Sequence, residues 1–96
     1  MRLSELVDRA HTNAKRNGFH DEEREFAVGI ALLHSELSEA LEAHRSDDWN
    51  GVKEELADVA IRLGDLCGQF NVDLEQEVQV KMAYNETRKY RHGKEY

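Results

Sequence analysis

Two pairs of acidic residues are the part of this sequence whose types and spacing best suit chemistry. Glu36 and Glu39 form a Glu-x-x-Glu pattern, and Glu55 and Asp58 form a Glu-x-x-Asp pattern. Residues i and i+3 lie on neighbouring turns of a helix, so each pair can hold one cation or straddle two. Four carboxylates without a soft ligand favour Mg²⁺ over zinc or copper, with Mn²⁺ as a possible substitute. The pattern therefore predicts a magnesium site.

The position of the first acidic pair on the expected helix supports the prediction of a metal site. At about 100° per residue, Glu36 and Glu39 lie on one flank of an apolar stripe. Gly29 and Ala43 share that flank and are small enough to admit a partner helix or a ligand. The stripe itself consists of Phe26, Ile30, Leu33, Leu37 and Ala40.

The second acidic pair repeats this geometry on the next segment. Glu55 and Asp58 lie together with Arg62 on one flank of a second apolar stripe. We therefore expect the two helices to pack together and to bring the four carboxylates close to one another. The second stripe consists of Val52, Leu56, Val59, Leu63, Cys67 and Phe70.

Four helices joined by short loops account for the whole chain, which predicts an all-α fold. The sequence has no proline and no useful strand-like alternation. Gly18 is expected to end the first helix, because glycine readily adopts the left-handed conformation of a C-terminal cap. The expected helices cover roughly 2–16, 21–44, 48–68 and 73–90, with Asp21, then Asp47 or Asp48, and then Asp73 as N-caps.

The fourth helix has an inward stripe that changes character along its length. The stripe begins with Leu74 and Val78 and continues as Lys81, Asn85 and Arg88. One interpretation is that the helix leaves the core and its end is solvated. The other is that two cations and an amide face the carboxylates, where they would bind phosphate oxygens and a sugar or base. The spacing leaves both open.

Composition limits the class of protein. The net charge of −7 and the pI near 5.2 argue against binding to nucleic acid, which requires clustered Lys and Arg. No apolar run is long enough for a signal peptide or a membrane span, so we expect a cytoplasmic protein. The single cysteine, Cys67, falls on an apolar stripe, which predicts a buried small side chain. Ninety-six residues predict one domain.

The segments 31–45, 54–66 and 81–88 resemble the all-α nucleotide pyrophosphohydrolases of the MazG type, relatives of dimeric dUTPases and of mammalian dCTP pyrophosphatase. That family has a double glutamate, a glutamate at +3, and Glu-x-x-Asp after a variable gap, which is 15 residues here. Ser35 stands where the family pattern has its first glutamate, so any role of that glutamate is either absent here or taken over by another residue. The segment Gly18-Phe19-His20 resembles the short, single-domain members of the family.

The resemblance implies both an activity and a set of site residues. The implied reaction is the Mg²⁺-dependent hydrolysis of a nucleoside triphosphate to the monophosphate and pyrophosphate. It also implies a single domain over 1–96 that assembles into helix bundles as a homodimer or homotetramer. The basic, aromatic C-terminal segment, with 91–96 at its end, is expected either to be a flexible, solvated tail or to fold over the site of a neighbouring subunit. The implied metal ligands are Glu36, Glu39, Glu55 and Asp58, and the implied nucleotide contacts are Lys81, Asn85 and Arg88.

Two further assignments follow from the expected chemistry. Glu39 is our candidate for the general base that accepts a proton from the attacking water. Phe19, His20 or Trp49 could recognise the base. The alternative function is a non-catalytic helical module that binds a nucleotide or a protein and holds a structural metal.

Overall fold

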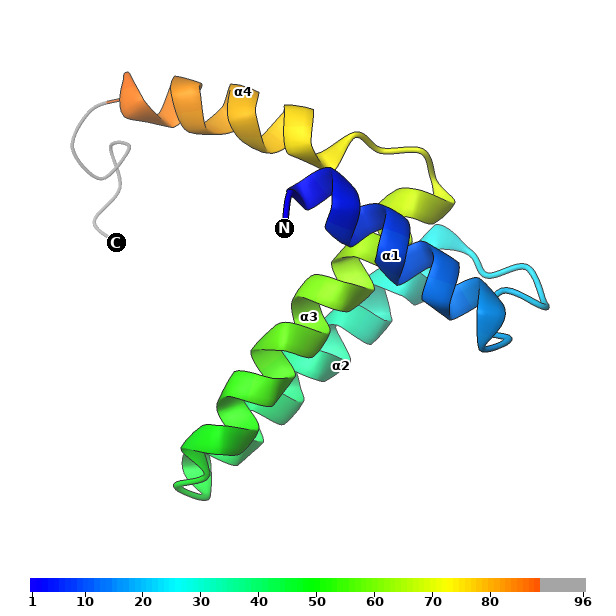
Figure 1. The fold of residues 1–96 in the computed structure, drawn as a ribbon. Coiled ribbons are helices and arrows are strands. Elements are labelled where there is room, and N and C mark those ends of the chain that lie inside the picture. The colour runs from blue at the N-terminus through cyan, green and yellow to red at the C-terminus, as the bar shows by residue number, and fades with distance from the viewer. Residues whose placement is uncertain (89–96) are drawn as a thin grey trace.

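The computed structural model describes residues 1–88, and these form four α-helices and no strand (Figure 1). This confirms the all-α prediction. The expected tail at 91–96 lies outside the described residues, whereas the fourth helix ends at Glu86 and not near 90 as expected. The helices are α1 (Leu3–Arg16), α2 (Phe26–Arg45), α3 (Trp49–Gln69) and α4 (Leu74–Glu86).

Three of the predicted helix boundaries are confirmed by local backbone geometry. Gly18 has a φ of 85° directly after the end of α1, as the left-handed cap requires. Asp48 accepts a hydrogen bond from the Gly51 amide at 2.9 Å and caps α3. Asp73 accepts one from the Gln76 amide at 3.1 Å and caps α4. Asp47, the other candidate for α3, instead has a φ of 56° in the turn.

The predicted start of α2 is wrong. Asp21 does not cap a helix, because α2 begins at Phe26 after Glu25. The residues from 17 to 25 form an irregular loop instead. Within this loop the side chains of His20 and Arg24 turn inward to reach α3. The segment before α2 is thus a loop whose His20 and Arg24 side chains contact α3, and the helix starts only after it.

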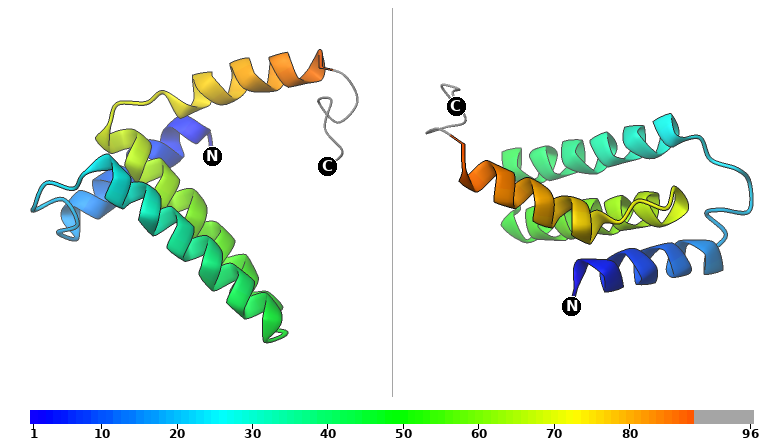
Figure 2. Two further views of the ribbon diagram at one scale, coloured as in Figure 1. Left: turned by 180° about the vertical axis from the view of Figure 1, so that it is seen from behind. Right: turned by 90° about the horizontal axis from the view of Figure 1, so that it is seen from above.

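Helices α2 and α3 form an antiparallel hairpin, and α1 packs on α3 (Figures 1 and 2). The prediction that Gly29 admits a partner helix is confirmed, because a Cβ there would lie 2.5 Å from Leu66 Cδ1 on α3. Gly68 plays the same role toward α1, since a Cβ there would lie 2.5 Å from His11 Cβ. These glycines bring the helix axes close together.

The buried core of the single chain is small, and the predicted apolar stripes are only partly correct. Phe26, Leu37 and Leu56 are about half exposed, whereas the flanking acid Glu36 is buried. Helices α2 and α3 therefore meet through a face that is rotated from the predicted one. The buried apolar side chains are Val7, Ala10, Ala40, Val52, Leu66 and Cys67, so the prediction for the cysteine is confirmed.

Helix α4 leaves the rest of the fold. Its packing is mainly against α1, where the Ser4 amide donates to Glu75 Oε1 at 3.4 Å, and it then runs away from the α2–α3 hairpin (Figure 1). Its side chains Val80, Met82 and Tyr84 are more than half exposed. Among the described residues, no helix is both long and apolar enough to cross a membrane.

Candidate metal centre and adjoining cavity

The α2–α3 hairpin brings three of the four predicted metal ligands together. Glu36 and Glu39 project from α2 and Glu55 from α3, and each offers a carboxylate oxygen within 4.8 Å of the others. Glu36 is buried, Glu55 is half-buried and Glu39 is exposed. The cluster therefore has one side open to solvent, through which a hydrated cation or an anionic ligand could enter.

A guanidinium balances part of this negative charge. Arg62, two turns along α3 from Glu55, donates a hydrogen bond from Nε to Glu36 Oε1 at 2.6 Å. This bond lowers the pKa of Glu36, against the opposing effect of its burial. Glu36 is therefore held as a carboxylate.

Glu55 has the opposite behaviour. Its hydrogen bonding with Glu36, its burial and its closeness to Glu39 raise the pKa of Glu55 from 4.5 to about 7. Three adjacent carboxylates cannot all ionise at low cost, so one of them retains a proton near neutral pH. A cation bound there would replace the proton and relieve the repulsion.

One oxygen of Glu55 bears on whether the cluster could hold a metal. Glu55 Oε2 is buried and has no hydrogen-bond partner among the described residues. A buried carboxylate oxygen without a donor is costly unless a cation or water satisfies it. Since the other available atoms are also carboxylate oxygens, the donor set suits Mg²⁺ or Mn²⁺.

Asp58 does not belong to the group of three, although it lies close by. It follows Glu55 by one turn on α3 and is exposed. Its side chain lines a cavity of about 290 Å³, to which Glu36 and Arg62 also contribute. Asp58 therefore lies where the predicted metal site opens into the cavity. The wall continues through α1 and the following loop, with Asn13, Asn17, Phe19 and Arg24.

Lys81, Asn85 and Arg88 are not brought to the carboxylates of their own chain. The first two lie on α4 and Arg88 follows its end, where the chain has diverged from the hairpin (Figure 1). The described residues that line the cavity come from α1, α2, α3 and the loop between α1 and α2. Lys81 Nζ and Arg88 Cζ instead lie 5.1 and 5.5 Å from the ring centroid of Tyr84.

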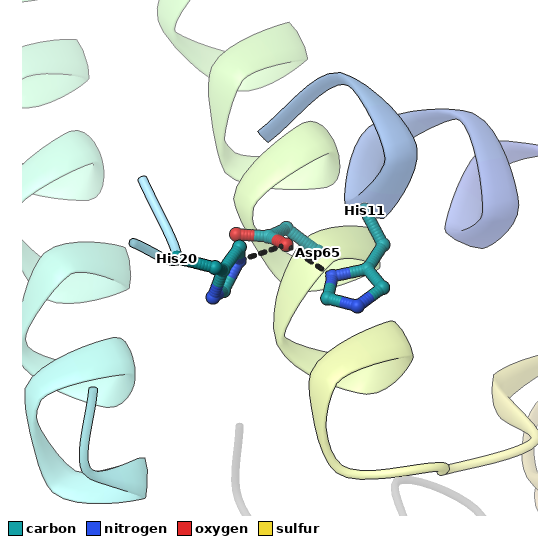
Figure 3. Close-up of side chains that lie close together, drawn as sticks. All are labelled: His11, His20 and Asp65. Atoms are coloured by element: carbon teal, nitrogen blue, oxygen red, sulfur yellow. Dashed lines mark hydrogen bonds and ion pairs between the residues drawn. The ribbon is translucent and has the colours of Figure 1, made fainter. Parts of the chain in front are cut away.

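The structure reveals a polar cluster that the sequence analysis missed. Asp65 on α3 is buried, and its Oδ1 lies 2.9 Å from His11 Nδ1 and 2.7 Å from His20 Nε2 (Figure 3). Its Oδ2 lies 3.8 Å from Arg24 Nη1. The three partners lie far from Asp65 in sequence, so no local pattern marks the cluster. The one available signal was an acid between the apolar residues Leu63 and Leu66.

Comparison with known proteins identified no similar protein. No family model, curated protein or solved structure matches this chain. The likeness to the MazG type therefore rests on the sequence pattern alone.

Proposed function

We propose that the protein is a Mg²⁺-dependent nucleoside triphosphate pyrophosphohydrolase of the MazG type. The observation that supports this best is the meeting of Glu36, Glu39 and Glu55 around the orphaned Glu55 Oε2, beside a cavity. An all-carboxylate site suits a metal that binds phosphates, and the neighbouring cavity offers room for the rest of a substrate.

Glu36, Glu39 and Glu55 would hold the metal, with Asp58 as the fourth ligand at the mouth of the cavity. When bound, Mg²⁺ neutralises the triphosphate and lowers the pKa of a coordinated water. Arg62 lies beside the same carboxylates and supplies a positive charge for a phosphate oxygen. This explains how an acidic protein could accept an anionic substrate.

Glu39 is the best placed of the cluster to accept a proton from the attacking water. It is exposed, whereas Glu36 is bonded to Arg62 and Glu55 is half-buried. In the proposed reaction the water oxygen attacks phosphorus and the bond between the α- and β-phosphates breaks. The water proton passes to Glu39, and pyrophosphate leaves.

The cavity is the proposed site for the nucleoside. Its volume of about 290 Å³ lies near the lower end of the range for small-molecule pockets. Phe19 offers an aromatic surface for stacking, and Asn13 and Asn17 offer donors and acceptors for a base or sugar. Trp49, a second candidate for base recognition, begins α3 at the opposite tip of the hairpin and is exposed.

The proposed role of α4 requires a second copy of the chain. Lys81, Asn85 and Arg88 can contact the substrate only if α4 of one protomer lies beside the carboxylates of another. Apolar side chains on the outer faces of the helices provide a surface for such an assembly, since Leu37, Leu41 and Val80 are about half exposed. We therefore include a homodimer or homotetramer in the proposal.

The direct test is hydrolysis of each nucleoside triphosphate with Mg²⁺, with and without chelator. The expected products, separated by chromatography, are the monophosphate and pyrophosphate. Formation of the diphosphate and orthophosphate would contradict the proposed bond cleavage. Glu54→Gln is the matched control for Glu55→Gln, because the two residues are adjacent on α3 and Glu54 is exposed outside the cluster.

The alternative is a non-catalytic module in which the three carboxylates hold a structural metal. It is favoured if Mg²⁺ binds and raises thermal stability, while no triphosphate is hydrolysed at any enzyme concentration tested. Loss of that stabilisation in Glu55→Gln, but not in Glu54→Gln, would assign the metal to this cluster.

A further inference from the structure

The loop from 17 to 25 is attached to the fold by few of its side chains. Phe19, Glu22 and Glu23 are exposed, whereas His20 and Arg24 turn inward and are only 11% and 17% exposed in their side chains. Both inward side chains approach Asp65. This loop also carries Phe19 and Arg24 into the wall of the cavity. The contacts with Asp65 therefore help to hold that part of the cavity wall in place.

Both oxygens of Asp65 are engaged. Oδ1 accepts hydrogen bonds from His11 Nδ1 and His20 Nε2 (Figure 3). Oδ2 lies 3.8 Å from Arg24 Nη1. An ionised carboxylate only accepts, so the protons must lie on those two imidazole nitrogens. One side chain thus connects α1, the loop and α3. The close approach of His11 depends on Gly68, which leaves room for it on α3.

A second side chain of α3 supports the same loop. Gln69, one turn after Asp65, donates from Nε2 to the Arg24 carbonyl oxygen at 2.8 Å. Arg24 in turn donates from Nη2 to the Phe19 carbonyl oxygen at 3.2 Å. Phe19 is therefore held through Arg24, and Arg24 is held by two residues of α3.

We propose that Asp65 is a positioning residue that clamps the 17–25 loop onto α3 and so sets the shape of the cavity that receives the nucleoside. The part concerning substrate rests on the proposed function, whereas the clamping of the loop does not. Loss of the clamp releases Phe19 and Arg24 from the cavity wall. The carboxylates on the hairpin keep their places, because α2 and α3 pack through other residues.

The same cluster offers two imidazoles and a carboxylate, a donor set that could bind a transition metal. The surroundings favour the clamp. A divalent cation at Asp65 would lie close to the Arg24 guanidinium and would have to displace both imidazole protons. With Arg24 present, the charge of Asp65 already has a cationic partner.

Hydrogen exchange of the whole chain tests the clamp without any need for activity. In Asp65→Ala the amides of 17–25 should exchange at least about tenfold faster, while those around Glu36 and Glu55 stay unchanged. Glu22→Ala, in the same loop but exposed, is the matched control and should leave exchange unchanged. If Asp65→Ala fails to fold, Asp65→Asn replaces it, since the amide keeps the size and removes the charge that faces Arg24.

Conservative replacement of the histidine distinguishes a clamp from general packing. His20→Gln places an amide donor near the position of Nε2 and should keep slow exchange, whereas His20→Ala should not. If the pyrophosphohydrolase activity is present, Asp65→Ala should raise KM about tenfold or more with kcat and the Mg²⁺ dependence little changed.

Three outcomes would overturn the proposal. One is unchanged loop exchange in a folded Asp65 variant. Another is equal behaviour of His20→Gln and His20→Ala. The third is stoichiometric Zn²⁺ binding by the wild type, measured calorimetrically and lost in His20→Ala, which would make the cluster a metal centre. If the wild type hydrolyses no triphosphate, the proposed function fails while the exchange data still decide the clamp.

Discussion

Arg62 donates a hydrogen bond from Nε to Glu36 Oε1 across 2.6 Å and so places a positive charge against the cluster of three carboxylates. Arg62→Gln should lower the free energy of unfolding by roughly 1 kcal/mol, because a partly exposed charge-assisted bond is lost. The same change should tighten Mg²⁺ binding, since a competing cation is removed. Denaturant unfolding and calorimetric titration with Mg²⁺ measure the two effects.

Lys53→Gln is the control for Arg62→Gln, because it removes an exposed positive charge from the same helix away from Glu36. It should change both quantities much less. Weaker Mg²⁺ binding in Arg62→Gln would show that the guanidinium supports the metal site rather than competing with the metal.

Replacement of each cluster acid by its amide tests metal dependence. Glu36→Gln, Glu39→Gln, Glu55→Gln and Asp58→Asn should each abolish most of the hydrolysis, while circular dichroism shows largely unchanged helicity. The amide keeps the size of the side chain and removes the charge that a hard cation requires. Undiminished, chelator-insensitive hydrolysis by Glu55→Gln or Asp58→Asn would falsify the assignment.

The raised pKa of Glu55 predicts a pH dependence of stability in metal-free protein. Below pH 4.5 Glu55 is protonated in both the folded and the unfolded state. Between 4.5 and about 7 the unfolded chain loses a proton that the folded protein retains, so this residue makes stability fall as pH rises. Glu36 acts in the opposite sense, because its lowered pKa adds stability above 4.5 that is lost as pH falls.

Urea unfolding at pH 5 and pH 8 measures this dependence. Relative to Glu54→Gln, the Glu55→Gln protein should lose less stability, or none, between the two pH values. Mg²⁺ must displace the Glu55 proton, so its binding should strengthen over the same interval and release protons. An identical pH profile in the wild type and in Glu55→Gln would mean that another group retains the proton.

Removal of the cations on and just after α4 tests their proposed contact with the substrate. Lys81→Ala and Arg88→Ala should weaken substrate use, with a loss in kcat/KM equivalent to roughly 2 to 4 kcal/mol if each makes a desolvated contact with phosphate. The Mg²⁺ affinity measured without substrate should be unchanged. Lys15→Ala, an exposed cation near the end of α1, is the control and should show wild-type kinetics.

The half-exposed apolar residues predict self-association. At micromolar concentration, sedimentation should show at least a dimer, and Ile61→Glu should shift the distribution toward smaller species and reduce activity. Ile61 also lines the cavity, so its effect on activity has two possible causes. Leu41 lies on the outer face of α2 and does not line that cavity. Leu41→Glu therefore distinguishes an effect of lost self-association from an effect on the cavity. A fully active monomer would show that the site is complete in one chain.

The sequence by itself determined those features of the fold that depend on residues close together in the chain. It correctly indicated the all-α class, the caps Asp48 and Asp73 and the break at Gly18, because these follow from backbone conformation and from hydrogen bonds over three residues. It also placed the acidic pairs correctly on their helices. Helical periodicity fixes such positions relative to one another, and three of the four acids do meet.

Only the tertiary structure decided how the helices are rotated and which distant side chains meet. The pairing of Glu36 with Arg62 spans 26 positions, and the bonds of Asp65 to His11 and His20 span 54 and 45. The raised pKa of Glu55 arises only when α2 and α3 face each other through their flanks, since it needs carboxylates from both helices. The divergence of α4 likewise depends on packing, because nothing in its own periodicity sets the angle at which it leaves α3.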